Sequence, residues 1–194
     1  MSMLELSLYI LDIAQNSISA GASIIEISVD EDTGSDLIII NISDNGCGMT
    51  EQQASRVDDP FYTTRTTRRV GLGIPLFRLA AEQAGGKLTV KSRPGRGTSV
   101  TASFVRSHVN CLPLGDISGT LAALIRLNPN LDFCYRQSLD GNSFSLDTKE
   151  LRRVLDGVPL DNSEVVSWIA GYVNEQIELL SGEGNAKPGQ NDLK

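Results

Sequence analysis

The sequence has few metal-binding and disulfide-forming residues, and their spacing matches neither kind of site. Its 194 residues include three cysteines and one histidine, and no two cysteines form a CxxC pair. The four ligands of a structural zinc site usually come as closely spaced pairs, so the absence of a CxxC pair argues against a zinc site. Unpaired cysteines are typical of a reducing compartment, and no apolar run reaches the ~20 residues of a membrane-spanning helix. We therefore expect a cytoplasmic protein with no membrane segment.

Positive charge is also scarce. The formal net charge is -7 and the isoelectric point is about 4.7. Nucleic-acid affinity depends on cations that neutralise phosphates, so we expect no nucleic-acid partner. Three arginines nevertheless crowd one short stretch, Arg65, Arg68 and Arg69. A basic cluster in an acidic chain indicates a small anionic ligand.

Residues 1–105 show the patterns of an α/β domain. Apolar residues at helical spacing predict a helix over residues 3–20, namely Leu4, Leu8, Leu11, Ala14 and Ile18. Alternating apolar residues predict a strand hairpin over 24–30 and 37–43. The remaining elements expected are a short helix over 50–57, a loop over 58–70, a helix over 73–86, and strands over 87–92 and 98–105.

A second region follows at residues 106–180. It begins with a connector that holds the single histidine, His108, which we interpret as a surface residue. Periodicity and the hairpin signal "LDGN" then predict a helix, a strand hairpin and further helices. We expect this helix–hairpin–helix extension to pack on the first domain. Residues 181–194 are rich in Gly, Asn, Lys and Pro, which predicts a disordered tail.

Three glycine-bearing segments carry the chemistry of the first region. "DNGCGM" (44–49) follows a strand, "GLGIPL" (71–76) opens a helix, and "GRGTSV" (95–100) opens the last strand. Glycines at a helix start let backbone N–H groups approach a phosphate, and the helix dipole favours its charge. Gly71, Leu72 and Gly73 are placed for that. Taken alone, a GxG before a helix is more often an ordinary tight turn.

The first predicted helix carries two polar residues on one face. Asp12 and Asn16 are four residues apart and so lie one above the other. An Asn16 oxygen suits Mg²⁺, which prefers hard oxygen ligands. Asp12 could orient or deprotonate a water or an incoming hydroxyl. On spacing alone, both residues could instead simply face solvent.

The ordered series "DIAQNSISAGAS", "DNGCGM", "GLGIPL" and "GRGTSV" resembles the GHKL ATPases. That superfamily includes gyrase, heat-shock chaperones, histidine kinases and mismatch-repair ATPases, and the match covers roughly residues 3–105. The stretch "DPFYTTRTTRRVGLGIPLFRLAAEQAGG" is similar to the histidine-kinase branch, in which an aromatic precedes a mobile loop over ATP. The resemblance implies a two-layer α/β sandwich that binds ATP with Mg²⁺.

The resemblance also implies a role for individual residues. Asp44 matches the acid that accepts a hydrogen bond from the adenine amino group, and an ionised carboxylate can only accept. Asn16 matches the magnesium ligand. The other implied nucleotide contacts are the backbone at Gly46 and Gly48, the pocket wall at Met49, the lid aromatic Phe61, Arg65 near the terminal phosphate, the phosphate loop Gly71–Leu72–Gly73, and Thr98 beside the adenine.

Two departures from the family pattern leave the reaction open. Asp12 stands where water-activating relatives carry Glu, and the shorter side chain reaches less far. The chain also shows no phosphoacceptor histidine on a preceding helix. The sequence therefore predicts phosphotransfer to an unidentified protein partner or slow ATP hydrolysis. Two alternatives remain, a nucleotide-dependent regulatory switch without useful turnover and an anti-sigma-like serine kinase.

Overall fold

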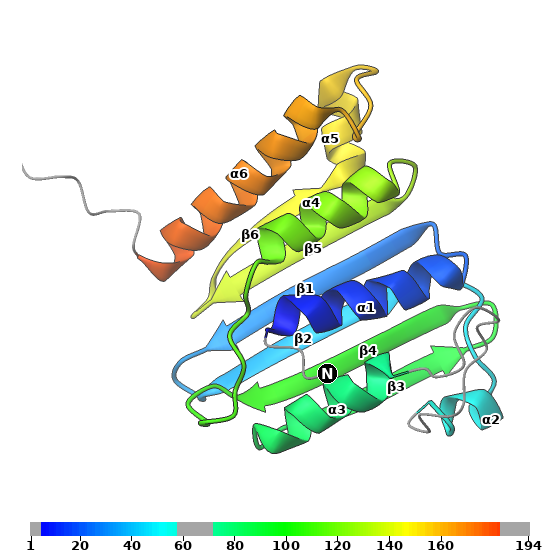
Figure 1. The fold of residues 1–194 in the computed structure, drawn as a ribbon, viewed down its shortest axis with the longest axis vertical. Helices are drawn as coiled ribbons and strands as arrows, with labels where there is room; N and C mark the ends of the chain where they lie inside the picture. Colours follow the sequence, from blue (N-terminus) through cyan, green and yellow to red (C-terminus); the bar gives the residue numbers. More distant parts are fainter. Residues whose placement is uncertain (1–4, 58–71, 183–194) are drawn as a thin grey trace, which may run out of the picture.

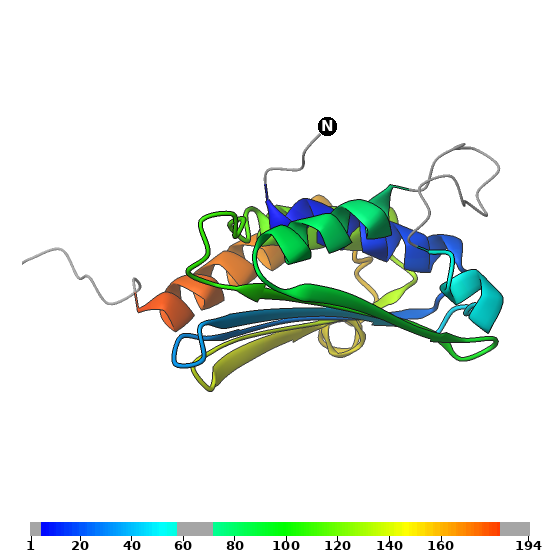
Figure 2. The ribbon, with the colours of Figure 1, turned by 90° about the horizontal axis from the view of Figure 1, so that it is seen from below.

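The structure is a computed structural model that describes residues 5–57 and 72–182. Within these residues a six-stranded sheet has the order β3-β4-β2-β1-β5-β6. Helices α3, α1, α4 and α6 lie side by side along one face of the sheet (Figure 1, Figure 2). The predicted two-layer α/β sandwich is confirmed. The strands are β1 (Ile24–Asp32), β2 (Leu37–Asp44), β3 (Lys87–Arg93), β4 (Gly97–Val105), β5 (Asp132–Leu139) and β6 (Asn142–Asp147). The helices are α1 (Leu6–Ser19), α2 (Glu51–Ala54), α3 (Gly73–Gln83), α4 (Ile117–Leu127), α5 (Thr148–Leu155) and α6 (Ser163–Ser181).

Strand β2 shows how the sequence directs its side chains. Ile38, Ile40 and Ile42 are buried and alternate with less buried residues. Successive side chains of a strand point to opposite faces, so these three isoleucines face the helices. Asp44 continues the same alternation at the end of the strand. The carboxylate is therefore directed to the helix-covered face and not to the bare face.

Helix α1 buries the predicted stripe only in part. Ala14 is fully buried and Leu11 and Ile18 pack against the core, but Leu8 is 37% exposed and Leu4 lies outside the described residues. The fully buried row contains Leu6, Ile10 and Ile13, which pack into the core. Both rows are apolar at helical spacing, so the choice between them depends on the sheet and neighbouring helices.

The second half of the chain extends the same sheet. Strand β5 pairs in parallel with β1, and β6 pairs antiparallel with β5. The connector before α4 also reaches α1, because the Leu6 and Ser7 N–H groups donate to the carbonyls of Pro113 and Leu114 at 2.9 and 2.8 Å. The first N–H groups of a helix have no partner within the helix, so this connector caps α1.

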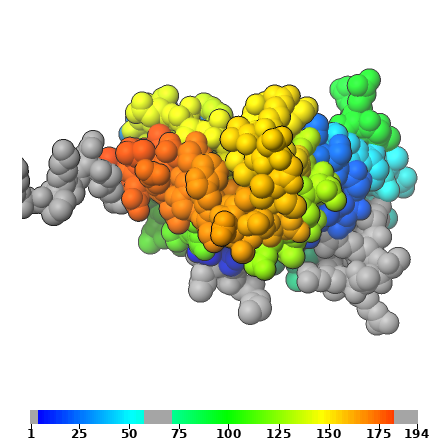
Figure 3. Space-filling view, turned by 90° about the horizontal axis from the view of Figure 1, so that it is seen from above, coloured from blue at the N-terminus to red at the C-terminus, as the bar shows by residue number. Residues whose placement is uncertain are grey.

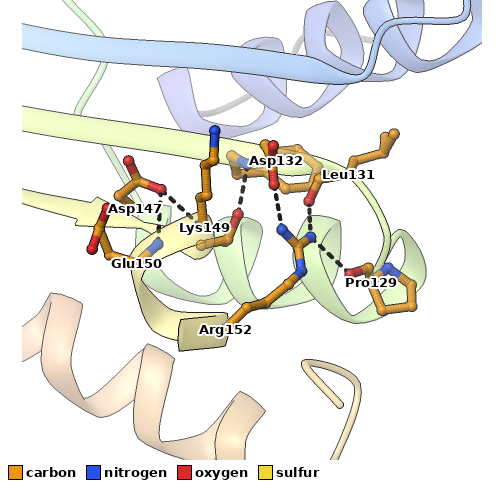
Figure 4. A network of polar contacts seen from close by, with 9 residues as sticks. Pro129, Leu131, Asp132, Asp147, Lys149, Glu150 and Arg152 are labelled. Atoms are coloured by element: carbon orange, nitrogen blue, oxygen red, sulfur yellow. Dashed lines mark hydrogen bonds and ion pairs between the residues drawn. The ribbon is translucent and has the colours of Figure 1, made fainter. Parts of the chain in front are cut away.

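Helices α5 and α6 complete the β6 end of the molecule (Figure 3). Asp147 caps α5 by accepting from the Lys149 N–H at 2.7 Å. Arg152 of α5 forms an ion pair with Asp132 and donates to nearby carbonyls, which ties α5 to the start of β5 (Figure 4). Helix α6 ends at Ser181, one residue into the segment expected as a tail. The rest of that segment, 183–194, lies outside the described residues.

The described parts of the chain contain no helix long and apolar enough to cross a membrane. They also contain no cluster of three or more His, Cys, Asp or Glu side chains that could hold a metal ion. A magnesium ion held by one protein ligand and several waters would not produce such a cluster.

Candidate functional site

Asp44 lies in a network that leaves part of its carboxylate available. Its Oδ1 atom accepts hydrogen bonds from the Gly46 N–H at 2.8 Å and the Thr98 N–H at 3.3 Å. Its Oδ2 atom accepts from the Ser17 hydroxyl at 2.7 Å. Each carboxylate oxygen can accept about two hydrogen bonds. Among the described residues, Oδ1 therefore has two donors and Oδ2 has one, which leaves Oδ2 able to accept from a further group.

Helix α1 brings Asp12 and Asn16 against the start of α3. A Cβ atom added to Gly73 would lie 1.9 Å from Asp12 Oδ2 and 3.6 Å from Asn16 Nδ2. Tyr9 of α1 and Phe77 of α3 stack with their ring centroids 5.1 Å apart, which holds the two helices together. Burial in this contact region raises the pKa of Tyr9. The two polar residues of α1 thus lie at the N-terminus of a helix that follows a glycine-rich segment.

Two glycine turns meet at the same end of the sheet. A Cβ on Gly48 would lie 2.0 Å from the Arg93 carbonyl oxygen, and one on Gly97 would lie 1.8 Å from that of Asp44. Both residues also have positive φ, 65° and 88°. The Gly95 N–H donates to the Cys47 carbonyl at 2.7 Å, which joins the turns directly. No larger residue fits at positions 48 and 97 without moving backbone.

The Ser92 hydroxyl connects three groups around these turns. It accepts from the Met49 N–H at 2.8 Å, donates to the Gly97 carbonyl at 3.0 Å, and lies 2.9 Å from the Thr98 hydroxyl. Met49 and Thr98 are both half-buried. The sequence predicted Met49 and Thr98 as site residues but not Ser92 or Ser17, the partner of Asp44. Ser17 follows Asn16 in a predicted helix, and nothing in that pattern indicates a hydrogen bond to a residue of β2.

Several predicted site residues lie outside the described residues, namely Phe61, Arg65 and Gly71, together with the loop expected over 58–70. Leu72 is described, and it is an exposed residue at the start of α3. The single histidine, His108, accepts a hydrogen bond from the Asn110 N–H at 3.1 Å. Its half-exposed position in the connector agrees with a surface role.

A surface hollow of about 580 Å³ lies at the opposite end of the strands, between the β1–β2 and β5–β6 turns. The polar side chains in and beside this hollow form hydrogen bonds with one another. Asp30 accepts from Arg136 at 2.9 Å and from Ser138 at 2.6 Å, and Asp140 accepts from the Thr33 hydroxyl at 2.8 Å. Asp44, whose Oδ2 atom can still accept a hydrogen bond, lies at the other end of the strands, so we place the candidate site there.

Comparisons with known proteins identify the family of the first half of the chain. The family described as "Histidine kinase-, DNA gyrase B-, and HSP90-like ATPase" matches residues 3–108. Curated relatives include Sporulation kinase E of Bacillus subtilis, 40% identical over 63 residues that make up 32% of this chain and 8% of that protein. Another is the sensor protein kinase FleS of Pseudomonas aeruginosa, 36% identical over 92 residues, covering 47% of this chain and 23% of that protein. The chain thus spans less than a quarter of the length of either relative.

A solved structure supports the fold independently. The crystal structure of the N-terminal domain of a DNA repair protein superimposes with a TM-score of 0.54 at 16% identity. The alignment covers 75% of this chain and 53% of that chain. At this identity the likeness concerns the fold alone. Since the family match extends over more than half of the sequence and contains all four motifs, the chain belongs to the histidine kinase-, DNA gyrase B- and HSP90-like ATPases, whose shared domain binds ATP.

Proposed function

We propose that this protein binds Mg-ATP at the Asp44 end of the sheet and passes the terminal phosphate to a partner protein, or to water at a low rate. The observation that carries the proposal is the meeting of three parts at one place. These are the partly free carboxylate of Asp44, the polar face of α1, and the glycine-rich start of α3.

Asp44 accounts for recognition of the base in this proposal. Its two backbone donors and Ser17 hold the carboxylate in one orientation, with acceptor capacity left on Oδ2. Adenine presents an amino group that donates, whereas guanine presents a carbonyl at the same ring position. An acceptor facing a carbonyl leaves both groups unpaired, which costs ~1–3 kcal/mol.

Asp12 and Asn16 account for the phosphate end. The Asn16 side chain can supply one oxygen to Mg²⁺, and the metal when bound would neutralise phosphate charge. The Asp12 carboxylate lies beside the backbone of Gly73, where the N-terminus of α3 favours an anion. From this position it can hold or remove a proton of an incoming hydroxyl or water.

Titration calorimetry tests the binding part. We expect the protein with magnesium to bind ATP more tightly than GTP, and Asp44→Asn to weaken ATP binding at least several-fold. Asparagine can keep its oxygen on the Gly46 and Thr98 N–H groups, so the fold should survive. Asp161→Asn, at an exposed position before α6, is the matched control. Equal affinities for ATP and GTP would contradict the assignment of Asp44.

Labelled phosphate separates the two reactions. ATP carrying a radioactive terminal phosphate should give labelled partner protein if the protein is a kinase, and free labelled phosphate if it is an ATPase. A third outcome, tight binding with neither product, would favour the regulatory switch. The Asp12 side chain, shorter than the Glu of water-activating relatives, makes this switch the second candidate.

A further inference from the structure

We propose that Ser92 sets the base specificity of the nucleotide site by fixing the direction of the Thr98 hydroxyl. This inference rests on the proposed function, because it concerns the same site. Ser92 belongs to β3 and lies at the strand's end on the helix-covered face, since it continues the alternation of Leu88 and Val90.

The direction follows from counting protons. A serine hydroxyl has one proton to donate and two lone pairs that accept. The Gly97 carbonyl can only accept, so the 3.0 Å contact uses the single proton of Ser92. The Met49 N–H can only donate, so the 2.8 Å contact uses one lone pair.

The third contact must then run from Thr98 to Ser92. Their oxygens are 2.9 Å apart, and Ser92 has only a lone pair left. If Ser92 instead donated to Thr98, two acceptors would face each other at the Gly97 carbonyl. Only one assignment makes all three contacts hydrogen bonds. The Thr98 proton is therefore committed to Ser92, and Thr98 Oγ1 can offer other groups only its lone pairs.

This assignment places two acceptors near one another. Asp44 and Thr98 are paired across β2 and β4, and the Thr98 N–H donates to Asp44 Oδ1 at 3.3 Å. Asp44 Oδ2 accepts by chemistry, and Thr98 Oγ1 accepts because Ser92 takes its proton. The pair suits a ligand edge that donates, such as an amino group or a water held by one, and opposes a carbonyl. Ser92 is thus a positioning residue that acts on the base through Thr98.

The experiment compares ATP with inosine triphosphate, which replaces the amino group by a carbonyl and leaves the sugar and phosphates unchanged. Calorimetry on the full chain should show ATP preferred by at least about tenfold. In Ser92→Ala the Thr98 proton becomes free to turn outward and donate to a carbonyl. We expect ATP binding several-fold weaker and inosine triphosphate binding unchanged or tighter, so the preference shrinks. Ser92→Thr keeps the hydroxyl and should restore the preference.

Two further variants keep the test decisive. Ser99→Ala is the control, because Ser99 lies on the neighbouring strand and accepts from Asn41 on the bare face at 3.0 Å. The preference of Ser99→Ala for ATP over inosine triphosphate should equal that of the original protein. Thr98→Val removes the acceptor itself and should also shrink the preference, so it replaces Ser92→Ala if that variant does not fold. An unchanged preference in folded Ser92→Ala would overturn the inference, and so would an unchanged preference in Thr98→Val. Failure of the original protein to bind ATP would instead overturn the proposed function.

Discussion

Replacing Gly73 by alanine should lower the rate of phosphate release or transfer about a hundredfold without weakening the fold. Gly73 is the first residue of α3 and has an ordinary negative φ, so its backbone accepts alanine. The added Cβ would lie 1.9 Å from Asp12 Oδ2, whereas real Cβ contacts essentially never fall below 3.0 Å. The carboxylate must therefore move by about 1.1 Å. A displacement of about 1 Å of a reacting group can lower a rate about a hundredfold.

The cost to stability should be small because the displaced atom is the end of a flexible side chain. Alanine also favours helix over glycine by up to ~1 kcal/mol in a helix interior, and by less at the first position. We therefore expect the free energy of unfolding of Gly73→Ala to stay within about 1 kcal/mol of the original protein. Release or transfer of labelled phosphate, measured beside thermal unfolding, should show a loss near a hundredfold in rate.

The same chemical change at two other glycines provides the controls. At Gly97 the Cβ would meet the Asp44 carbonyl at 1.8 Å, and φ is 88°. Backbone cannot swing away as a side chain can, so Gly97→Ala should lose both stability and nucleotide binding. At Gly171, inside α6, no atom lies within 4 Å, so alanine should leave function intact and raise stability. Gly73→Ala with normal phosphate transfer and normal ATP affinity would refute the placement of Asp12 at the reaction.

Three other predictions concern the ends of the site and the extension. Asp12→Ala should retain ATP binding and lose phosphate release, and Asp12→Glu should raise hydrolysis by restoring reach; unchanged release in both would exclude the base role. Asn16→Ala should remove the magnesium dependence of ATP affinity, measured by calorimetry with and without the metal. Residues 1–108 alone should aggregate or unfold on heating well below the full chain, because β1 loses its β5 partner and α1 its capping carbonyls; an equally stable fragment would contradict this.

Local patterns predicted most of the fold because they act over a few residues. The alternation of Ile38, Ile40 and Ile42 predicted β2 and its buried face. "LDGN" predicted the β5–β6 hairpin, whose turn contains Asp140 with φ 49° and Gly141 with φ 87°. Such signals reflect backbone preferences that the surrounding fold rarely overrides.

The buried face of α1 was predicted only in part, because the helix is apolar on more than one side. The predicted row contains Leu4, Leu8, Leu11, Ala14 and Ile18, and a neighbouring row contains Leu6, Ile10 and Ile13. Burial of either row would remove similar apolar area from water, so the local sequence does not decide. The buried face is instead set by packing against the sheet and against Phe77 of α3, whose ring stacks on Tyr9, next to Ile10. These contacts join residues more than sixty positions apart.

The hydrogen bonds of the candidate site were hidden for the same reason. Ser17 is 27 residues from Asp44, and Ser92 is 43 residues from Met49. The motifs predicted which residues would contact a nucleotide. They did not predict which residues orient those side chains, because serine is common and carries no periodic signal. The direction of the hydroxyl protons, on which the proposed base specificity depends, could be assigned only from all three partners of Ser92.

The extension affects the site through helix α1, which carries Asp12 and Asn16. Its connector supplies carbonyls to the first N–H groups of α1, and α4 packs beside that helix. Asp12 and Asn16 lie two and three turns further along the same helix. A rigid helix held at its N-terminus by the connector and at its other end by Ser17 and Asp44 keeps both residues at a fixed position relative to Gly73. Loosening the connector should therefore lower phosphate transfer before it lowers adenine recognition, since Asp44 keeps its two backbone donors from Gly46 and Thr98.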